Sequence, residues 1–119
     1  QADGGTRTAS ITGGFVALQQ CVNILKDKGI INTNPIKNHV AAISCGVVQG
    51  DVLVDLDYLE DSSADIDANF VMNDEDQIIE LQLTGEQTTC SEDQLNEMIK
   101  LSKQSVQLLI QRQKEALSA

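Results

Sequence analysis

The hydrophobic period changes twice along this chain, and this limits the possible folds more than any other feature. At both ends apolar residues recur every three to four positions, as on one face of a helix, whereas in the middle they alternate with polar residues, as in a strand. The apolar face near the start consists of Ile11, Phe15, Leu18, Val22 and Leu25. This spacing predicts a helix over residues 6–28, with Gly29 as its C-terminal cap.

Two adjacent glycines, Gly13 and Gly14, interrupt this first helix. Each costs a helix about 1 kcal/mol relative to Ala, because glycine loses the most backbone freedom on folding. Two such costs in one helix predict that another part of the molecule packs closely against it at this point.

Four strands are expected in the middle of the chain, over residues 40–48, 52–58, 68–72 and 77–84. Gln49-Gly50 is a hairpin signal between the first two, and the polar run from Asn73 to Asp76 predicts a turn between the last two. In the second strand, apolar residues at every other position indicate that one face is buried and one is exposed.

A second helix is predicted from Ser91 to about Leu117. Ser91-Glu92-Asp93-Gln94 matches the capping box, in which the first and fourth side chains bond each other's backbone N–H groups. The fold class is therefore α+β: a helix, a four-stranded and mainly antiparallel sheet, and a long C-terminal helix.

Charge argues against direct nucleic-acid binding by this chain alone. The 119 residues carry 18 acidic and 8 basic side chains, a net charge of −10, and a polyanion is repelled by such a surface. The chain has no Trp, one Tyr and two Phe, so it has few aromatic platforms for stacked bases. Binding to RNA would need a divalent cation or a basic partner.

The cysteines and the single histidine give little material for catalysis. Cys21, Cys45 and Cys90 are odd in number and lack zinc-ligand spacing, which favours buried thiols in a reducing compartment. His39 is the one histidine, which makes a histidine-based dyad or triad a poor hypothesis. No apolar run approaches membrane-spanning length, and we expect a soluble cytoplasmic protein without a membrane partner.

The glycine-rich segment Gly4-Gly5-Thr6-Arg7-Thr8-Ala9-Ser10 precedes the first helical face. Glycine lets a backbone approach an anion, the first N–H groups of a helix lack internal partners, and the guanidinium of Arg7 matches phosphate geometry. A glycine turn followed by a Thr N-cap, with Arg7 solvated, explains the same residues. Taken alone, the segment favours that structural explanation somewhat.

Acidic residues gather between residues 56 and 67. They are Asp57, Glu60, Asp61, Asp65 and Asp67. A solvated acidic loop is the ordinary interpretation of such a run, and ligation of Mg²⁺ is the functional one, since Mg²⁺ takes one or two carboxylates together with waters and phosphate oxygens. Together with a phosphate loop, this segment would complete a site for phosphoryl transfer.

Two of these segments resemble the signatures of bacterial ribonuclease PH. The first is QADGGTRTASITG over residues 1–13, and the second is DLDY over residues 55–58 with Glu60-Asp61-Ser62 and Asp67-Ala68-Asn69. Thr33-Asn34-Pro35 resembles a turn of the same family, and the similarity runs in register from residue 1 to about residue 82. The chain departs from the family pattern at Leu83 and Cys90, in place of a Gly and a downstream Phe.

The resemblance implies a phosphate-dependent 3′→5′ exoribonuclease, or tRNA nucleotidyltransferase, that trims the 3′ ends of tRNA precursors. Inorganic phosphate is its co-substrate and nucleoside 5′-diphosphates are its products. By motif, Gly5, Thr6 and Arg7 would hold the attacking phosphate. Asp61 and Asp67 would bind Mg²⁺ or Mn²⁺, or act as the acid at the leaving 3′ oxygen.

The resemblance also implies a domain division and an assembly. Residues 1–36 would be the C-terminal end of the family's domain 1, with the phosphate loop and a helix, and residues 37–119 would be its domain 2. The family's chain begins well before this point and contributes basic RNA-contacting residues there. We therefore expect this to be the C-terminal portion of the enzyme, acidic and inactive by itself, from a homo-oligomer that forms a hexameric ring of dimers.

Two other functions fit parts of the sequence. A non-catalytic structural subunit of an exosome-like ring shares the expected fold, but inactive ring members usually lose the phosphate-loop Arg or the acidic pair, and this chain keeps Arg7, Asp61 and Asp67. An acidic module that binds divalent cations without RNA is the third possibility. The enzyme is the favoured hypothesis.

Overall fold

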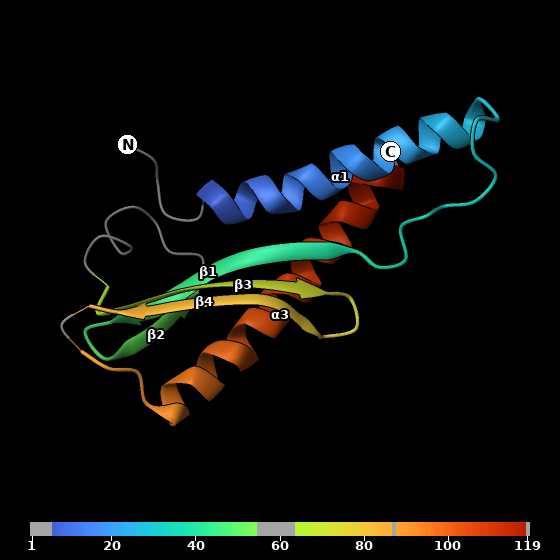
Figure 1. Ribbon diagram of the computed structural model, residues 1–119. Coiled ribbons are helices and arrows are strands. Elements are labelled where there is room, and N and C mark those ends of the chain that lie inside the picture. The colour runs from blue at the N-terminus through green and yellow to red at the C-terminus, as the bar shows by residue number, and fades with distance from the viewer. Residues whose placement is uncertain (1–5, 55–63, 87, 119) are drawn as a thin grey trace.

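The computed structural model describes residues 6–54, 64–86 and 88–118. The elements in chain order are α1 (Thr6–Asp27), β1 (Val40–Val48), β2 (Asp51–Val54), β3 (Ile66–Asn73), β4 (Ile78–Gly85) and α3 (Glu92–Ser118). The strands form one sheet, with α1 on one face and α3 on the other, so the predicted α+β class is confirmed (Figure 1). Neither described helix is long and apolar enough to cross a membrane.

The sheet has the strand order β2-β1-β3-β4, and every neighbouring pair is antiparallel. The hairpin between β1 and β2 turns at Gln49 and Gly50, whose φ angles of 52° and 87° are both positive. Two positive φ angles are typical of the primed two-residue turns that match the twist of the flanking strands. The predicted hairpin signal is therefore confirmed.

The hydrophobic core lies between the sheet and α3. Apolar residues at alternate positions of β1 and β3 face this helix, and Phe70 at the centre is fully buried. The buried members are Ala41, Ile43, Cys45, Val47, Ile66, Ala68, Phe70, Met72, Met98, Val106 and Ile110. Burial raises the pKa of the Cys45 thiol to about 11, so this cysteine is a structural residue rather than a reactive one.

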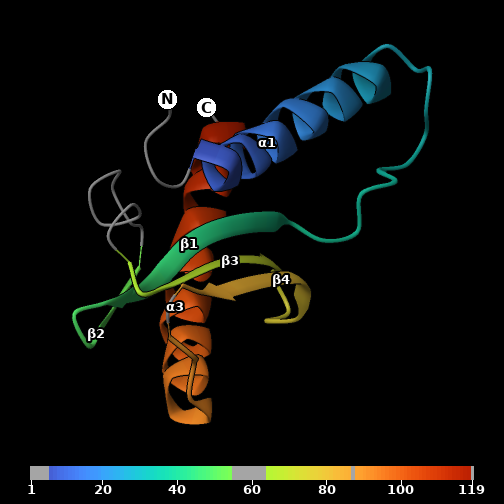
Figure 2. The same cartoon turned by 60° about the vertical axis from the view of Figure 1, so that its left-hand side comes forward.

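A joint of buried polar groups fixes α1 to the rest of the fold. The Thr12 hydroxyl accepts a hydrogen bond from the Ala42 N–H at 3.0 Å. The Gln113 amide of α3 donates both to the Thr12 carbonyl at 3.0 Å and to the Val40 carbonyl at 2.8 Å. Figure 2 shows how this arises, since the C-terminal end of α3 passes the sheet and reaches α1. The joint holds α1 at a fixed height above the sheet.

The helix ends agree with the sequence signals. The N–H of Ile30 bonds the Leu25 carbonyl at 2.9 Å past Gly29, which has a φ of 73°. Ser91 and Gln94 make the reciprocal bonds of the capping box at 3.0 and 3.1 Å. The strand ends shift by up to two residues: the third strand covers Ile66–Asn73 rather than residues 68–72. The second strand is described over Asp51–Val54, and the remainder of the predicted 52–58 lies outside the described residues.

The expected close packing at Gly13 and Gly14 is wrong for the part of the chain that the structure describes. A Cβ atom built at either position meets no heavy atom within 4 Å. Both glycines are on the exposed side of α1, because the helix turns Thr8, Phe15, Gln19 and Val22 inward instead. The helix-propensity cost of the two glycines is thus not offset by any contact among the described residues.

Candidate functional site

The face of the sheet below α1 carries polar side chains. Because the odd-numbered residues of β1 and the even-numbered residues of β3 face α3, the alternate residues of both strands face α1. The strand register arranges them in three rows, which run Gly46–Asp67–Thr84, Ser44–Asn69–Gln82 and Ala42–Val71–Glu80. The site is therefore a set of polar side chains on a rigid sheet, one face away from the core.

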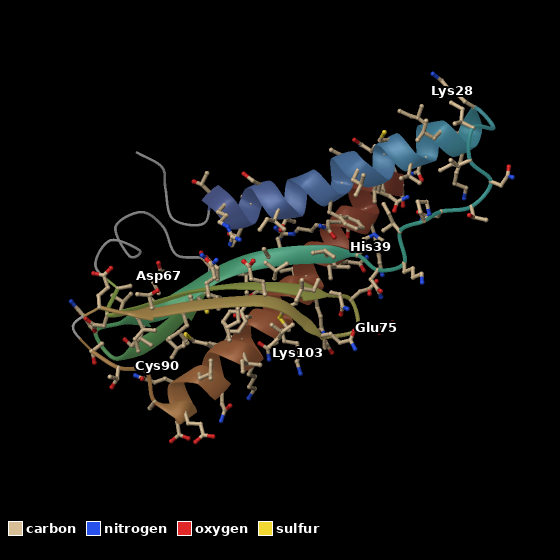
Figure 3. The ribbon with its side chains drawn as sticks, in the orientation of Figure 1. Lys28, His39, Asp67, Glu75, Cys90 and Lys103 are labelled. Carbon is tan, nitrogen blue, oxygen red and sulfur yellow. The ribbon has the colours of Figure 1, made fainter. Side chains whose placement is uncertain are left out.

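Asp67 occupies the first of these rows. It is partly buried on β3, with the backbone of β1 on one side and that of β4 on the other. Its neighbour across β1 is Gly46, which has no side chain to crowd the carboxylate. Asp67 lies at the end of the sheet toward which the N-terminal end of α1 points (Figure 3). A strand between two others holds a side chain more precisely than a loop does.

Arg7 is the second residue of α1 and reaches the same face of the sheet. Its Nη2 atom donates to Oε1 of Glu80 on β4 at 2.6 Å. Glu80 is in the third row, opposite Val71, and Val71 is four residues from Asp67 along β3, or ~13 Å. Arg7 and Asp67 are therefore on one side of the sheet, at rows that lie ~13 Å apart along β3.

Three further predicted site residues have different outcomes. Thr6 is the first residue of α1, at the end of the helix where the helix dipole favours negative charge. Gly5 and Asp61 lie outside the described residues. The roles of all five predicted residues, Gly5, Thr6, Arg7, Asp61 and Asp67, stay predictions.

Asp67 is the described residue of the predicted cation site. Among the described residues, no group of three or more His, Cys, Asp and Glu side chains is placed to hold a metal ion. Mg²⁺ needs one or two carboxylates and completes its shell with water and phosphate oxygens. Asp67, which is partly buried beside Gly46, is one such carboxylate.

Glu80 was not predicted as a site residue. Its contact with Arg7 joins positions 73 residues apart, which no local pattern reveals. One signal was available: Glu80, Gln82 and Thr84 alternate with Leu81 and Leu83, so the last strand has one polar face.

His39 belongs to a different part of the molecule. Its ring packs on Phe15 at a centroid distance of 4.7 Å, near the opposite end of β1 (Figure 3). Burial is the main cause that lowers its pKa, the positive charge of Lys114 adds to that effect, and Asp74 opposes it. His39 is a packing residue between α1 and the sheet.

Comparison with known proteins agrees with this arrangement. Residues 38–105 match the model of the 3′ exoribonuclease family, domain 2, and this range covers the whole sheet and the first half of α3. The chain belongs to the 3′ exoribonuclease family. The domain division at residues 36/37 stays a prediction.

The resemblance to ribonuclease PH is confirmed by its curated relatives within the 3′ exoribonuclease family. Ribonuclease PH of Neisseria meningitidis serogroup C / serotype 2a is 53% identical over 119 residues, which are 100% of this chain and 49% of the relative. Ribonuclease PH of Methylobacterium nodulans is 48% identical over 117 residues, which are 98% of this chain and 49% of the relative. The chain spans about half the length of the curated relatives it matches.

Solved structures show the same fold at low identity. Rrp46 of rice (Oryza sativa) superposes with a TM-score of 0.71 at 21% identity, covering 99% of this chain and 50% of its own. An archaeal exosome core gives a TM-score of 0.59 at 20% identity, covering 67% of this chain and 32% of its own. At such identities the likeness concerns the fold alone.

Proposed function

We propose that this chain is part of a phosphate-dependent 3′→5′ exoribonuclease that trims the 3′ ends of tRNA precursors. The observation that carries the proposal is the placement of Arg7 and Asp67 on one polar face of a sheet in the 3′ exoribonuclease family. A cationic group and a carboxylate on one face would supply the two charges that a phosphoryl-transfer reaction needs, in which positioning and charge stabilisation supply most of the catalysis.

The attacking side of the site is the N-terminal end of α1. Gly5, Thr6 and Arg7 would hold inorganic phosphate, with the guanidinium and the backbone N–H groups facing its oxygens. One phosphate oxygen attacks the phosphorus of the last phosphodiester, and the bond from that phosphorus to the 3′ oxygen breaks. The last nucleoside leaves as a 5′-diphosphate, so the protein needs no nucleophile of its own.

The leaving side of the site is the acidic segment with Asp67. The 3′ oxygen of the shortened RNA must gain a proton or a positive neighbour as its bond breaks. Asp61 and Asp67 would supply this, either as the acid or by holding Mg²⁺ or Mn²⁺. When bound, such a cation neutralises charge on the leaving oxygen.

RNA, a ring assembly and a cytoplasmic location complete the proposal. With a net charge of −10, this segment repels RNA at a distance, so the attraction must come from basic residues elsewhere in the assembly. The matched relatives are about twice as long, and two structures of the same fold are described as exosomes, one with RNA bound to the active site. We infer a homo-oligomer, of the hexameric ring type, in a reducing compartment that suits the free thiols Cys21, Cys45 and Cys90.

A phosphate-dependence assay tests the proposal. The protein expressed from its full open reading frame is incubated with a tRNA precursor that carries extra 3′ nucleotides, with and without inorganic phosphate. Nucleoside 5′-diphosphates are expected with phosphate and no product without it, and Arg7→Ala is expected to raise the KM for phosphate. Nucleoside 5′-monophosphates formed without phosphate would show a hydrolase and contradict the proposal.

The alternative, a non-catalytic subunit of an exosome-like ring, is favoured by one observation. Two solved structures that are described as exosomes share the fold of this chain, at 20% and 17% identity. The same assay separates the two, because a structural subunit would bind RNA or partner subunits and release no nucleotide at any phosphate concentration.

A further inference from the structure

The ion pair between Arg7 and Glu80 joins the two elements on either side of the candidate phosphate site. The Nη2 atom of Arg7 is 2.6 Å from Oε1 of Glu80. A guanidinium has five N–H donors in a planar fork, so one bond to a carboxylate leaves the other edge for an anion. Glu80 can therefore orient the guanidinium of Arg7 and leave its other N–H donors available to an anion.

Stability does not explain this pair. The side chains are 48% and 41% exposed, and exposed ion pairs contribute little to folding because both partners are well hydrated. The pair does restrict a long side chain that otherwise samples many rotamers. Its main consequence is thus the position of the guanidinium relative to Asp67 on the same face of the sheet.

Two effects of Glu80 on phosphate binding oppose each other. Its negative charge repels phosphate, whereas its bond orients the cation that attracts phosphate. At this exposure the effective dielectric constant is high and the repulsion is weak. The bond with Glu80 also removes most of the rotamers that are open to a free Arg7 side chain, so we expect the orienting effect to prevail.

We propose that Glu80 is a positioning residue for the phosphate site, which fixes the guanidinium of Arg7 for the attacking phosphate. This inference rests on the proposed function. It assigns a role to a residue on β4, in the third row of the polar face, which the glycine-rich and aspartate motifs do not include.

The test uses the protein from its full open reading frame and compares Glu80→Gln with the wild type. The KM for inorganic phosphate is expected to rise about two- to fivefold, the range of an exposed ion pair, while kcat changes by less than about twofold. Glu80→Asp should lie between the two. Glu97→Gln is the matched control, because it removes the same charge from an exposed position on α3, on the other face of the sheet.

Two further readouts separate positioning from a general structural effect. In Arg7→Met, which removes the guanidinium, a second change of Glu80→Gln is expected to have no added effect on the KM, which would show coupling between the two residues. The phosphate concentration that gives half of the thermal stabilisation should also rise in Glu80→Gln.

Each outcome decides the matter. An unchanged or lowered KM in Glu80→Gln, with a normal wild type, would overturn the positioning role and leave the proposed function intact. A wild-type protein that neither binds phosphate nor uses it would overturn both.

Discussion

The two faces of the sheet differ in what their side chains do, although the same strands supply both. On the α3 face, β1 and β3 present a continuous apolar layer around Phe70. On the α1 face, the residues between these include Ser44, Asp67 and Asn69, and α1 is attached by hydrogen bonds of Thr12 and Gln113. Because successive side chains of a strand point to opposite faces, residues that stabilise the core alternate with residues of the candidate site along each strand.

This separation explains how the candidate site can be polar without weakening the domain. Asp67 has Ile66 and Ala68 as its chain neighbours, and both are almost fully buried on the opposite face. A strand that is anchored by such neighbours holds its polar side chain in place at no cost to the core. The contrast between the faces leads to five predictions.

The largest effect is expected for Asp67→Asn, which changes the polar face alone. Turnover in the phosphorolysis assay should fall by about two to three orders of magnitude, because the amide neither ligates a hard cation well nor donates an acidic proton. Thermal unfolding should be nearly unchanged. Asp65→Asn, at an exposed position just before β3, is the matched control, and near-normal turnover in Asp67→Asn would remove this residue from the mechanism.

The opposite pattern is expected for Phe70→Ala on the core face. Phe70 is 0% exposed, so its truncation to alanine leaves a cavity in the core. The unfolding free energy measured by urea titration is expected to fall by about 3–5 kcal/mol. Ile79→Ala, on a β4 residue that is 56% exposed, should cost less than about 0.5 kcal/mol. Equal losses of unfolding free energy in the two variants would contradict the assignment of Phe70 to the core.

The joint below α1 is tested by Gln113→Leu, which keeps the volume and removes the amide. Gln113 is 3% exposed, and its change leaves the carbonyls of Thr12 and Val40 without this donor. The loss of this donor from two part-buried carbonyls is expected to cost about 1–3 kcal/mol in total. Gln111→Leu, at an exposed position of α3, is the control. The KM for phosphate should rise as well, since α1 carries Arg7, and an unchanged KM would separate the joint from the site.

The sequence predicts the elements well and their contacts poorly. Capping and turn signals located Gly29, Ser91 and the Gln49-Gly50 hairpin, because each depends on a few adjacent residues. The strand order and the pairing of Arg7 with Glu80 depend on segments far apart, so no local pattern encodes them. Of the predicted site, the common side of Arg7 and Asp67 is found in the structure, whereas Gly5 and Asp61 lie outside its described residues.

Substitution of two glycines by alanine is expected to change stability in opposite directions. A Cβ at Gly85 would collide with the carbonyl oxygen of Thr88, so Gly85→Ala should lose about 1–3 kcal/mol of stability. Gly13 has open space and a helical conformation, so Gly13→Ala should gain up to about 1 kcal/mol. Both are measured by urea unfolding. A loss for Gly13→Ala in the protein from its full open reading frame would mean that another segment packs on the outer side of α1.

The smallest effect concerns the pH dependence contributed by His39, at the end of the sheet away from Asp67. The folded state lowers its pKa below 6.5, chiefly through burial against Phe15, so the unfolded chain binds the proton more readily. This contribution is present above about pH 6.5 and is lost as the pH falls toward the folded pKa.

Neighbouring groups allow the His39 effect to be isolated. Lys114 adds to the lowering of the His39 pKa, and Asp74 opposes it. The pKa of Asp74 is itself held below 3.8, mainly by the hydrogen bond that Asn38 donates. The stability contributed by Asp74 is therefore lost only at lower pH. Unfolding free energies of the wild type should therefore decline by less than about 1.4 kcal/mol per pH unit below pH 6.5. His39→Gln should flatten that part of the profile. A wild type that gains stability as the pH falls through this range would contradict the prediction. It would show that the attraction of Asp74 for a protonated His39 outweighs the cost of burying that charge against Phe15.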